Sequence, residues 1–93
     1  MEDKLVAYSE TQVLCKLLDI VTLHSDELYD VDMFIEDVTK YDWPGRLDPD
    51  AQVNFNCGLM AFCKLGMHFS LAAEVILFTE LSEWAARYFN PEM

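Results

Sequence analysis

The sequence predicts an all-α protein of about five helices that pair in antiparallel hairpins. Two observations predict this fold class. Apolar residues recur every three or four positions along most of the chain, which is the periodicity of helices that bury one face. Residue types that start and stop helices, such as Ser9, Asp48-Pro49 and Gly66, stand at the boundaries of these periodic runs. With 93 residues, the chain is expected to form a single domain spanning residues 1–93.

An acidic pair of helices is predicted for residues 9–40. The first helix begins at the capping box Ser9-Glu10-Thr11-Gln12 and extends to about His24. Ser25 and Asp26 supply the cap of the second helix, which ends near Lys40. Apolar stripes run along both helices and consist of Val13, Leu14, Leu17, Leu18 and Val21 in the first, and of Leu28, Val31, Phe34, Ile35 and Val38 in the second. Each helix is therefore amphipathic and needs a cover on one side.

A loop is predicted for residues 41–48, between the acidic pair and the rest of the chain. Pro44-Gly45 is a turn dipeptide, and Trp43, which precedes the proline, is disfavoured in the α region of the backbone. The loop therefore divides the chain into an acidic half and an apolar helical hairpin with a tail, residues 49–90.

The boundaries of this apolar hairpin are marked by capping residues. Asp48-Pro49 is a cap followed by a proline in the first helical position, Gly66 is placed to end that helix, and Ser70 caps the next one. The turn is so short that the two helices are expected to be antiparallel neighbours. The junction near Thr79-Glu80 is weakly signalled, so one long helix and two helices with a bend both fit. Asn90-Pro91 ends the helical region.

The stretch of residues 51–78 is too apolar for an ordinary surface helix. It has 19 apolar residues in 28 positions, and its charged residues are Lys64 and Glu74. One face can meet the chain's own core, whereas the other needs a second cover. We therefore expect an apolar groove that binds a partner and has a floor formed by Phe55, Leu59, Met60, Phe62 and Met67, because methionine and aromatic side chains suit adaptable binding surfaces. The alternative, that these residues belong to ordinary core, stays open at this point.

Small residues form a stripe on the first helix of the hairpin. Ala51, Asn54, Gly58 and Ala61 follow one another at helical spacing. A glycine in mid-helix costs about 1 kcal/mol relative to alanine, which is tolerated where a neighbouring helix approaches closely. We expect such a close crossing at Gly58.

The charge of the chain argues against nucleic acid as a partner. Seventeen acidic residues face six basic ones, which gives a formal net charge of −11, and phosphate binding depends on lysine and arginine. The acid is concentrated in residues 1–50, which hold 13 acidic and four basic residues, a net charge of −9. No apolar run is long enough to predict a membrane span.

Motifs of catalysis, metal binding and cofactor binding are not found in the sequence. It has no glycine-rich phosphate loop, no nucleophile with a base in sequence reach, and no paired histidine and carboxylate motif. Cys15, Cys57 and Cys63 are an odd number, and no secretory signal precedes them. We therefore expect a non-enzymatic protein with reduced thiols, without catalytic, metal or cofactor-binding residues, located in the cytoplasm.

The second half of the chain resembles tetratricopeptide-type hairpins, in which small residues let two helices nest. More specifically, residues 50–91 resemble the tetratricopeptide-like chaperones of type III secretion needle subunits. The residues that carry the resemblance are Leu65-Gly66, Leu71-Ala72-Ala73 and the tail of residues 81–91, LSEWAARYFNP. The resemblance covers under half of the chain and implies a tetratricopeptide-like array of helices. It also implies a cytoplasmic chaperone that, with a small helical co-chaperone, holds the amphipathic helix of a needle subunit and prevents premature polymerisation.

Two functions follow from these observations as expectations. The first is a small cytoplasmic chaperone that binds an amphipathic helix of a secreted or self-assembling protein in the apolar groove, and so forms a hetero-oligomer. The alternative is a small acidic inhibitor, of the immunity-protein kind, whose carboxylates block a basic site on a target protein.

Overall fold

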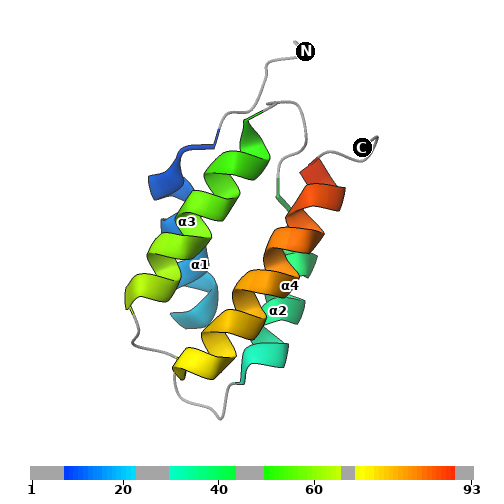
Figure 1. The fold of residues 1–93 in the computed structure, drawn as a ribbon. Helices are drawn as coiled ribbons and strands as arrows, with labels where there is room; N and C mark the ends of the chain where they lie inside the picture. The colour runs from blue at the N-terminus through cyan, green and yellow to red at the C-terminus, as the bar shows by residue number, and fades with distance from the viewer. Residues whose placement is uncertain (1–7, 23–29, 44–49, 66–68, 90–93) are drawn as a thin grey trace.

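The protein is all-helical over the residues that the structure describes. The computed structural model describes residues 8–22, 30–43, 50–65 and 69–89. These contain four helices, α1 (Glu10–Thr22), α2 (Val31–Lys40), α3 (Ala51–Leu65) and α4 (Leu71–Phe89), and no strand (Figure 1). The all-α prediction is confirmed. The expected count of about five helices and the expected tetratricopeptide-like array are not confirmed, and of the two possibilities near Thr79-Glu80 the structure has one long helix, since α4 continues through both residues.

The start of α1 confirms the predicted capping box. The backbone N–H of Ser9 donates to Oε1 of Gln12 at 2.8 Å, and the backbone N–H of Gln12 donates to Oγ of Ser9 at 3.1 Å. Each side chain thus satisfies an amide that has no partner within the helix. The described part of α1 ends at Thr22, and His24 lies outside the described residues.

The start of α2 differs from the prediction. The cap is Asp30, whose Oδ1 accepts a hydrogen bond from the N–H of Met33 at 2.9 Å and whose backbone is extended. Ser25 and Asp26, the predicted caps, lie outside the described residues. The Asp30 side chain satisfies the backbone N–H of Met33, which has no partner within the helix. Asp30 is therefore sufficient to cap α2, and the helix begins at Val31. Its end at Lys40 is as predicted.

The boundaries of the apolar hairpin are confirmed where they fall on described residues. Oγ of Ser70 accepts a hydrogen bond from the N–H of Ala73 at 3.2 Å, which caps α4. The other predicted boundary residues, Asp48-Pro49, Gly66 and Asn90-Pro91, lie outside the described residues.

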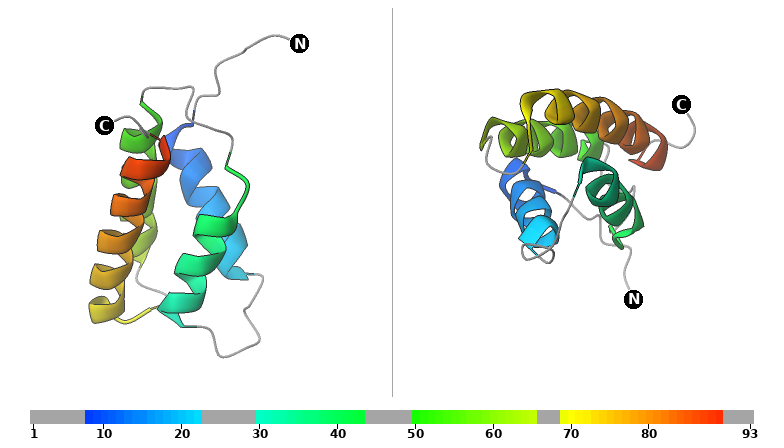
Figure 2. Two further views of the ribbon diagram at one scale, coloured as in Figure 1. Left: turned by 90° about the vertical axis from the view of Figure 1, so that its right-hand side faces the viewer. Right: turned by 90° about the horizontal axis from the view of Figure 1, so that it is seen from below.

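The four helices form two layers, with α3 and α4 in one layer and α1 and α2 in the other (Figure 2). Within each layer the helices are antiparallel, whereas α1 runs parallel to α3, and α2 runs parallel to α4 (Figures 1 and 2). The helices are in contact around a ring in the order α1, α3, α4, α2, and α1 packs more extensively against α3 than against α2. One core therefore lies between two antiparallel hairpins.

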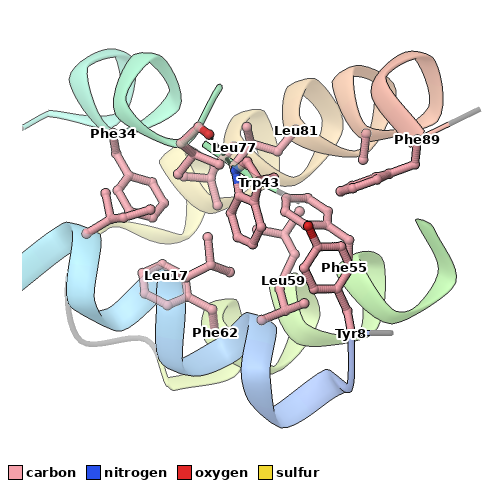
Figure 3. Close-up of a cluster of buried hydrophobic side chains, with 14 of the residues drawn as sticks. Tyr8, Leu17, Phe34, Trp43, Phe55, Leu59, Phe62, Leu77, Leu81 and Phe89 are labelled. Carbon is pink, nitrogen blue, oxygen red and sulfur yellow. Dashed lines mark hydrogen bonds between the residues drawn. The ribbon is translucent and has the colours of Figure 1, made fainter. Parts of the chain in front are cut away.

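All four helices contribute side chains to this core (Figure 3). From Leu77 to Phe89, α4 turns one apolar stripe inward, because its buried residues recur every four positions. The fully buried or nearly fully buried side chains of the helices are Val13, Leu17, Ile20, Val21, Phe34, Val38, Ala51, Phe55, Leu59, Phe62, Leu77, Leu81, Ala85 and Phe89. No charged side chain is buried among the described residues.

An aromatic cluster closes the core around Trp43, which follows α2. The indole N–H of Trp43 donates to the carbonyl of Val38 at 2.8 Å, and the Trp43 carbonyl accepts from the hydroxyl of Tyr88 at 2.7 Å. The indole also meets Tyr8 and Phe55 edge to face, with ring centroids 5.9 and 5.4 Å apart. The segment after α2 is thereby fixed to the end of α4 and to α3.

The predicted close crossing at Gly58 is confirmed, and the partner is α1. A Cβ atom built on Gly58 would lie 2.6 Å from Cβ of Val13 and 2.9 Å from the carbonyl oxygen of Glu10. Both distances are shorter than van der Waals contact. The glycine therefore allows α1 and α3 to touch backbone to backbone.

Candidate functional site

The structure places three of the five predicted groove residues in the core. Phe55 and Leu59 are fully buried, and Phe62 is 3% exposed. Phe55 packs against Trp84, and Phe62 stacks on Phe34 at a centroid distance of 5.2 Å. Because α1 and α2 dock on this side of α3, these residues have the ordinary core role that the sequence left open, and they form no accessible groove floor.

The remaining two predicted residues differ in placement. Met60 is 47% exposed on the outer side of α3. Met67 lies outside the described residues. Met60 is thus the predicted groove residue that is accessible to a partner.

The apolar surface that the structure leaves uncovered lies largely on the outer sides of α3 and α4. Leu71 is 78% exposed and Val75 is 61% exposed, although both are large and apolar. A contiguous exposed apolar patch on a small protein commonly marks an interaction site. The other exposed large apolar residues are Met33, Val53, Met60, Leu65 and Ile76.

A hollow between α3 and α4 gathers several of these residues. We call it the outer groove. It has a volume of about 260 Å³ and is lined by Met60, Cys63, Leu71, Glu74, Val75, Phe78 and Thr79. Five of these seven side chains are apolar or thiol groups, so the groove suits the apolar side chains of another molecule.

A second hollow lies on the other side of Met60, between α1 and α3. It has a volume of about 280 Å³ and is lined by Glu10, Cys57, Met60, Ala61 and Lys64. Met60 belongs to both hollows, so together they make an uneven surface that extends from α4 across α3 to α1. This surface is more polar at its α1 end.

The electrostatics of the outer groove are set by Glu74. Burial, and to a smaller extent the negative charge of Glu74, raise the pKa of the Cys63 thiol to about 11. Cys63 is therefore a protonated, weakly reactive thiol at neutral pH. Glu74 is itself half-buried, and its carboxylate has no ion pair within the part of the chain that the structure describes.

Several exposed acidic residues lie on α2 and next to it. Asp30, Asp32 and Glu36 are exposed, and Glu36 forms an ion pair with Lys40 at 3.0 Å, in which both side chains are largely solvent-exposed. An exposed pair of this kind contributes little to stability. The exposed carboxylates of Asp30, Asp32 and Glu36 give this part of the surface a negative character.

The exposed α4 residues were not among the predicted groove residues. Their signal was nevertheless present, because Leu71, Val75 and Phe78 follow one another at helical spacing. That stripe lies beside the inward stripe of Leu77 and Leu81, and a helix with two apolar stripes has more apolar surface than one core can cover.

Two further properties of the described residues bear on function. No helix there has the length and apolar character needed to cross a membrane. Among the same residues, no group of three or more histidine, cysteine, aspartate or glutamate side chains is placed to hold a metal ion.

Comparison of the chain with protein-family models, curated proteins and solved structures found no match.

Proposed function

We propose that the chain is a non-enzymatic protein-binding module that holds an amphipathic helix of a partner protein in the outer groove. The observation that carries this proposal is the hollow between α3 and α4, whose lining residues Met60, Leu71 and Val75 are large, apolar and exposed. A groove between two helices accepts a third helix by taking in side chains spaced three or four residues apart. Met60, which lines both hollows, has a flexible side chain that can adapt to a partner.

A more specific form of this proposal is a cytoplasmic chaperone of a self-assembling protein, with type III secretion needle subunits as the case suggested by the resemblance of residues 50–91. Its structural support is the way in which the two antiparallel hairpins pack, with α1 parallel to α3 and α2 parallel to α4. Helical-repeat proteins also stack their helix pairs with corresponding helices parallel. In this form the complex contains the needle subunit helix and a small helical co-chaperone.

The experiment that tests the proposal places a charge on the groove. Met60→Glu requires a partner to bury an unpaired carboxylate, which costs several kcal/mol and abolishes binding. Because Met60 is 47% exposed, we expect folding to survive. Val53→Glu is the matched control, since Val53 is an exposed apolar residue of the same helix that lines neither hollow.

The measurement is copurification of partners with the tagged full-length protein, together with thermal melting by circular dichroism. The proposal is supported if a protein that copurifies with the wild type and with Val53→Glu is lost from Met60→Glu while the helicity of Met60→Glu is unchanged. It is contradicted if every protein that copurifies with the wild type also copurifies with both variants.

The second candidate function is the acidic inhibitor, which is favoured by the exposed carboxylates at Asp30, Asp32 and Glu36 and by the net charge of −11. Here the acidic surface occupies a basic site on a target protein. Salt and Met60→Glu together distinguish the two candidates. An acidic inhibitor loses its partner as ionic strength rises, and Met60→Glu leaves its binding unchanged, whereas Met60→Glu abolishes binding in the groove, whose apolar contribution to affinity persists in salt.

A further inference from the structure

We propose that the helix held in the outer groove is basic, and that one of its lysine or arginine side chains pairs with Glu74. This inference rests on the proposed function, because it names the chemistry of the partner at the same site. It is carried by the position of Glu74 among the apolar residues that line the groove, Leu71, Val75 and Phe78.

Glu74 is the acidic residue that lines the outer groove. It is half-buried in the wall of the groove, and its charge acts on the thiol of Cys63 across from it. In the part of the chain that the structure describes, no lysine or arginine pairs with it. The carboxylate is also partly exposed, so solvent can reach it in the free protein.

An apolar partner that filled the groove would remove that water. A carboxylate that loses its hydration without gaining a cation is strongly destabilised. If the partner has a lysine or arginine opposite Glu74, an ion pair replaces the lost hydration. The groove therefore favours a partner helix that carries a cation one turn from the apolar side chains that enter the groove. Glu74 is therefore a specificity-determining residue of the groove.

The charge of the whole chain favours the same partner over a second copy of the chain. Each copy has a net charge of −11, so two copies repel one another. A basic helix is instead attracted towards the chain, and the charged residue that lines the outer groove is the acidic Glu74. The surface that both hollows share through Met60 therefore fits a helix with an apolar stripe and flanking cations.

The test uses the full-length protein and three synthetic helical peptides, each of about 20 residues. All three carry the same leucine and methionine stripe, and their flanking positions are lysine, glutamine or glutamate. A fourth peptide keeps the lysines and has serine in place of the apolar stripe. Calorimetric titration at low salt, about 50 mM, gives the four affinities.

We expect the lysine peptide to bind about tenfold more tightly than the glutamate peptide at low salt, with the glutamine peptide between them. Glu74→Gln reduces this preference severalfold and leaves the affinity for the glutamine peptide unchanged or improved. Glu83→Gln is the matched control, because Glu83 is an exposed glutamate of the same helix that lines neither hollow, and it leaves the preference intact.

The outcomes separate this inference from the proposed function. If the three striped peptides bind equally well and Met60→Glu abolishes their binding, the partner need not be basic and the groove remains the binding site. If none of them binds, or if Met60→Glu changes nothing, both proposals are overturned. Binding of the serine peptide as tight as that of the lysine peptide also overturns both, because the acidic surface alone then accounts for binding.

Discussion

Substitution of Gly58 by alanine tests whether α1 and α3 are in direct backbone contact. The added Cβ would lie 2.6 Å from Cβ of Val13, 2.7 Å from its Cγ1 and 2.9 Å from the carbonyl oxygen of Glu10. Carbon atoms in contact prefer a separation of about 3.5–4.0 Å. Two of these three atoms, Cβ of Val13 and the Glu10 oxygen, cannot move away by a side-chain rotation, so α1 as a whole must shift.

The expected magnitude follows from two opposing terms. Overpacking costs about 1–3 kcal/mol, and the upper end applies here because the backbone must move. Alanine has an advantage of about 1 kcal/mol over glycine within a helix. Gly58→Ala is therefore expected to lower the free energy of unfolding by about 2 kcal/mol, which corresponds to a decrease in Tm of about 8–16 °C for a domain of this size.

Urea denaturation followed by circular dichroism measures this change. Cys57→Ala is the control, since Cys57 is the exposed neighbour of Gly58, and we expect its effect to stay within about 0.5 kcal/mol. If Gly58→Ala instead raised the stability by about 1 kcal/mol, only the helix propensity would be acting. The contact between α1 and α3 at this position would then be refuted.

Three further predictions concern single side chains. At pH 8 the Cys63 thiol should react with a thiol reagent far more slowly than the exposed Cys57 thiol. The reaction rate of Cys63 should rise towards pH 11, because burial has raised the pKa of this thiol to about 11. Equal rates for the two thiols at pH 8 would contradict the burial of Cys63. Tyr88→Phe removes the hydrogen bond to the Trp43 carbonyl and should cost about 1 kcal/mol in urea denaturation, and an unchanged midpoint would argue against that bond. Ser9→Ala should cost about 1 kcal/mol in the same assay, whereas Ser9→Asp, which keeps a capping oxygen, should retain most of the stability.

The helices themselves could largely be predicted from the sequence, because periodicity and capping are local properties. The capping box at Ser9 and the cap at Ser70 are where they were expected. The start of α2 was misplaced because Asp26 and Asp30 stand in one acidic run and both are good capping residues. Which of them serves as the cap depends on how the preceding chain reaches the helix, and sequence spacing does not contain that information.

The candidate site was harder to predict, because α3 is apolar on more than one face. Phe55, Leu59 and Phe62 share one face and Met60 lies on another, and both faces satisfy a helical pattern. The face that becomes core is decided by the side on which α1 and α2 dock, which is a tertiary property. The junction near Thr79-Glu80 was left open for a related reason, since its outcome depends on packing: Leu77 and Leu81 hold α4 against the core on both sides of Thr79, and α4 continues as one helix.

The parallel pairing of α1 with α3 has a consequence for the chain as it is synthesised. α1 finds its most extensive contacts on α3 and fewer on α2, so much of its apolar stripe lacks its cover until α3 has been synthesised. Chains grow at about 5–20 residues per second, so this half waits for seconds as an exposed nascent chain. Its net charge of −9 repels neighbouring nascent chains during that interval. We therefore expect the acidity of the first half to keep the unfinished protein soluble, independently of any role in the finished one.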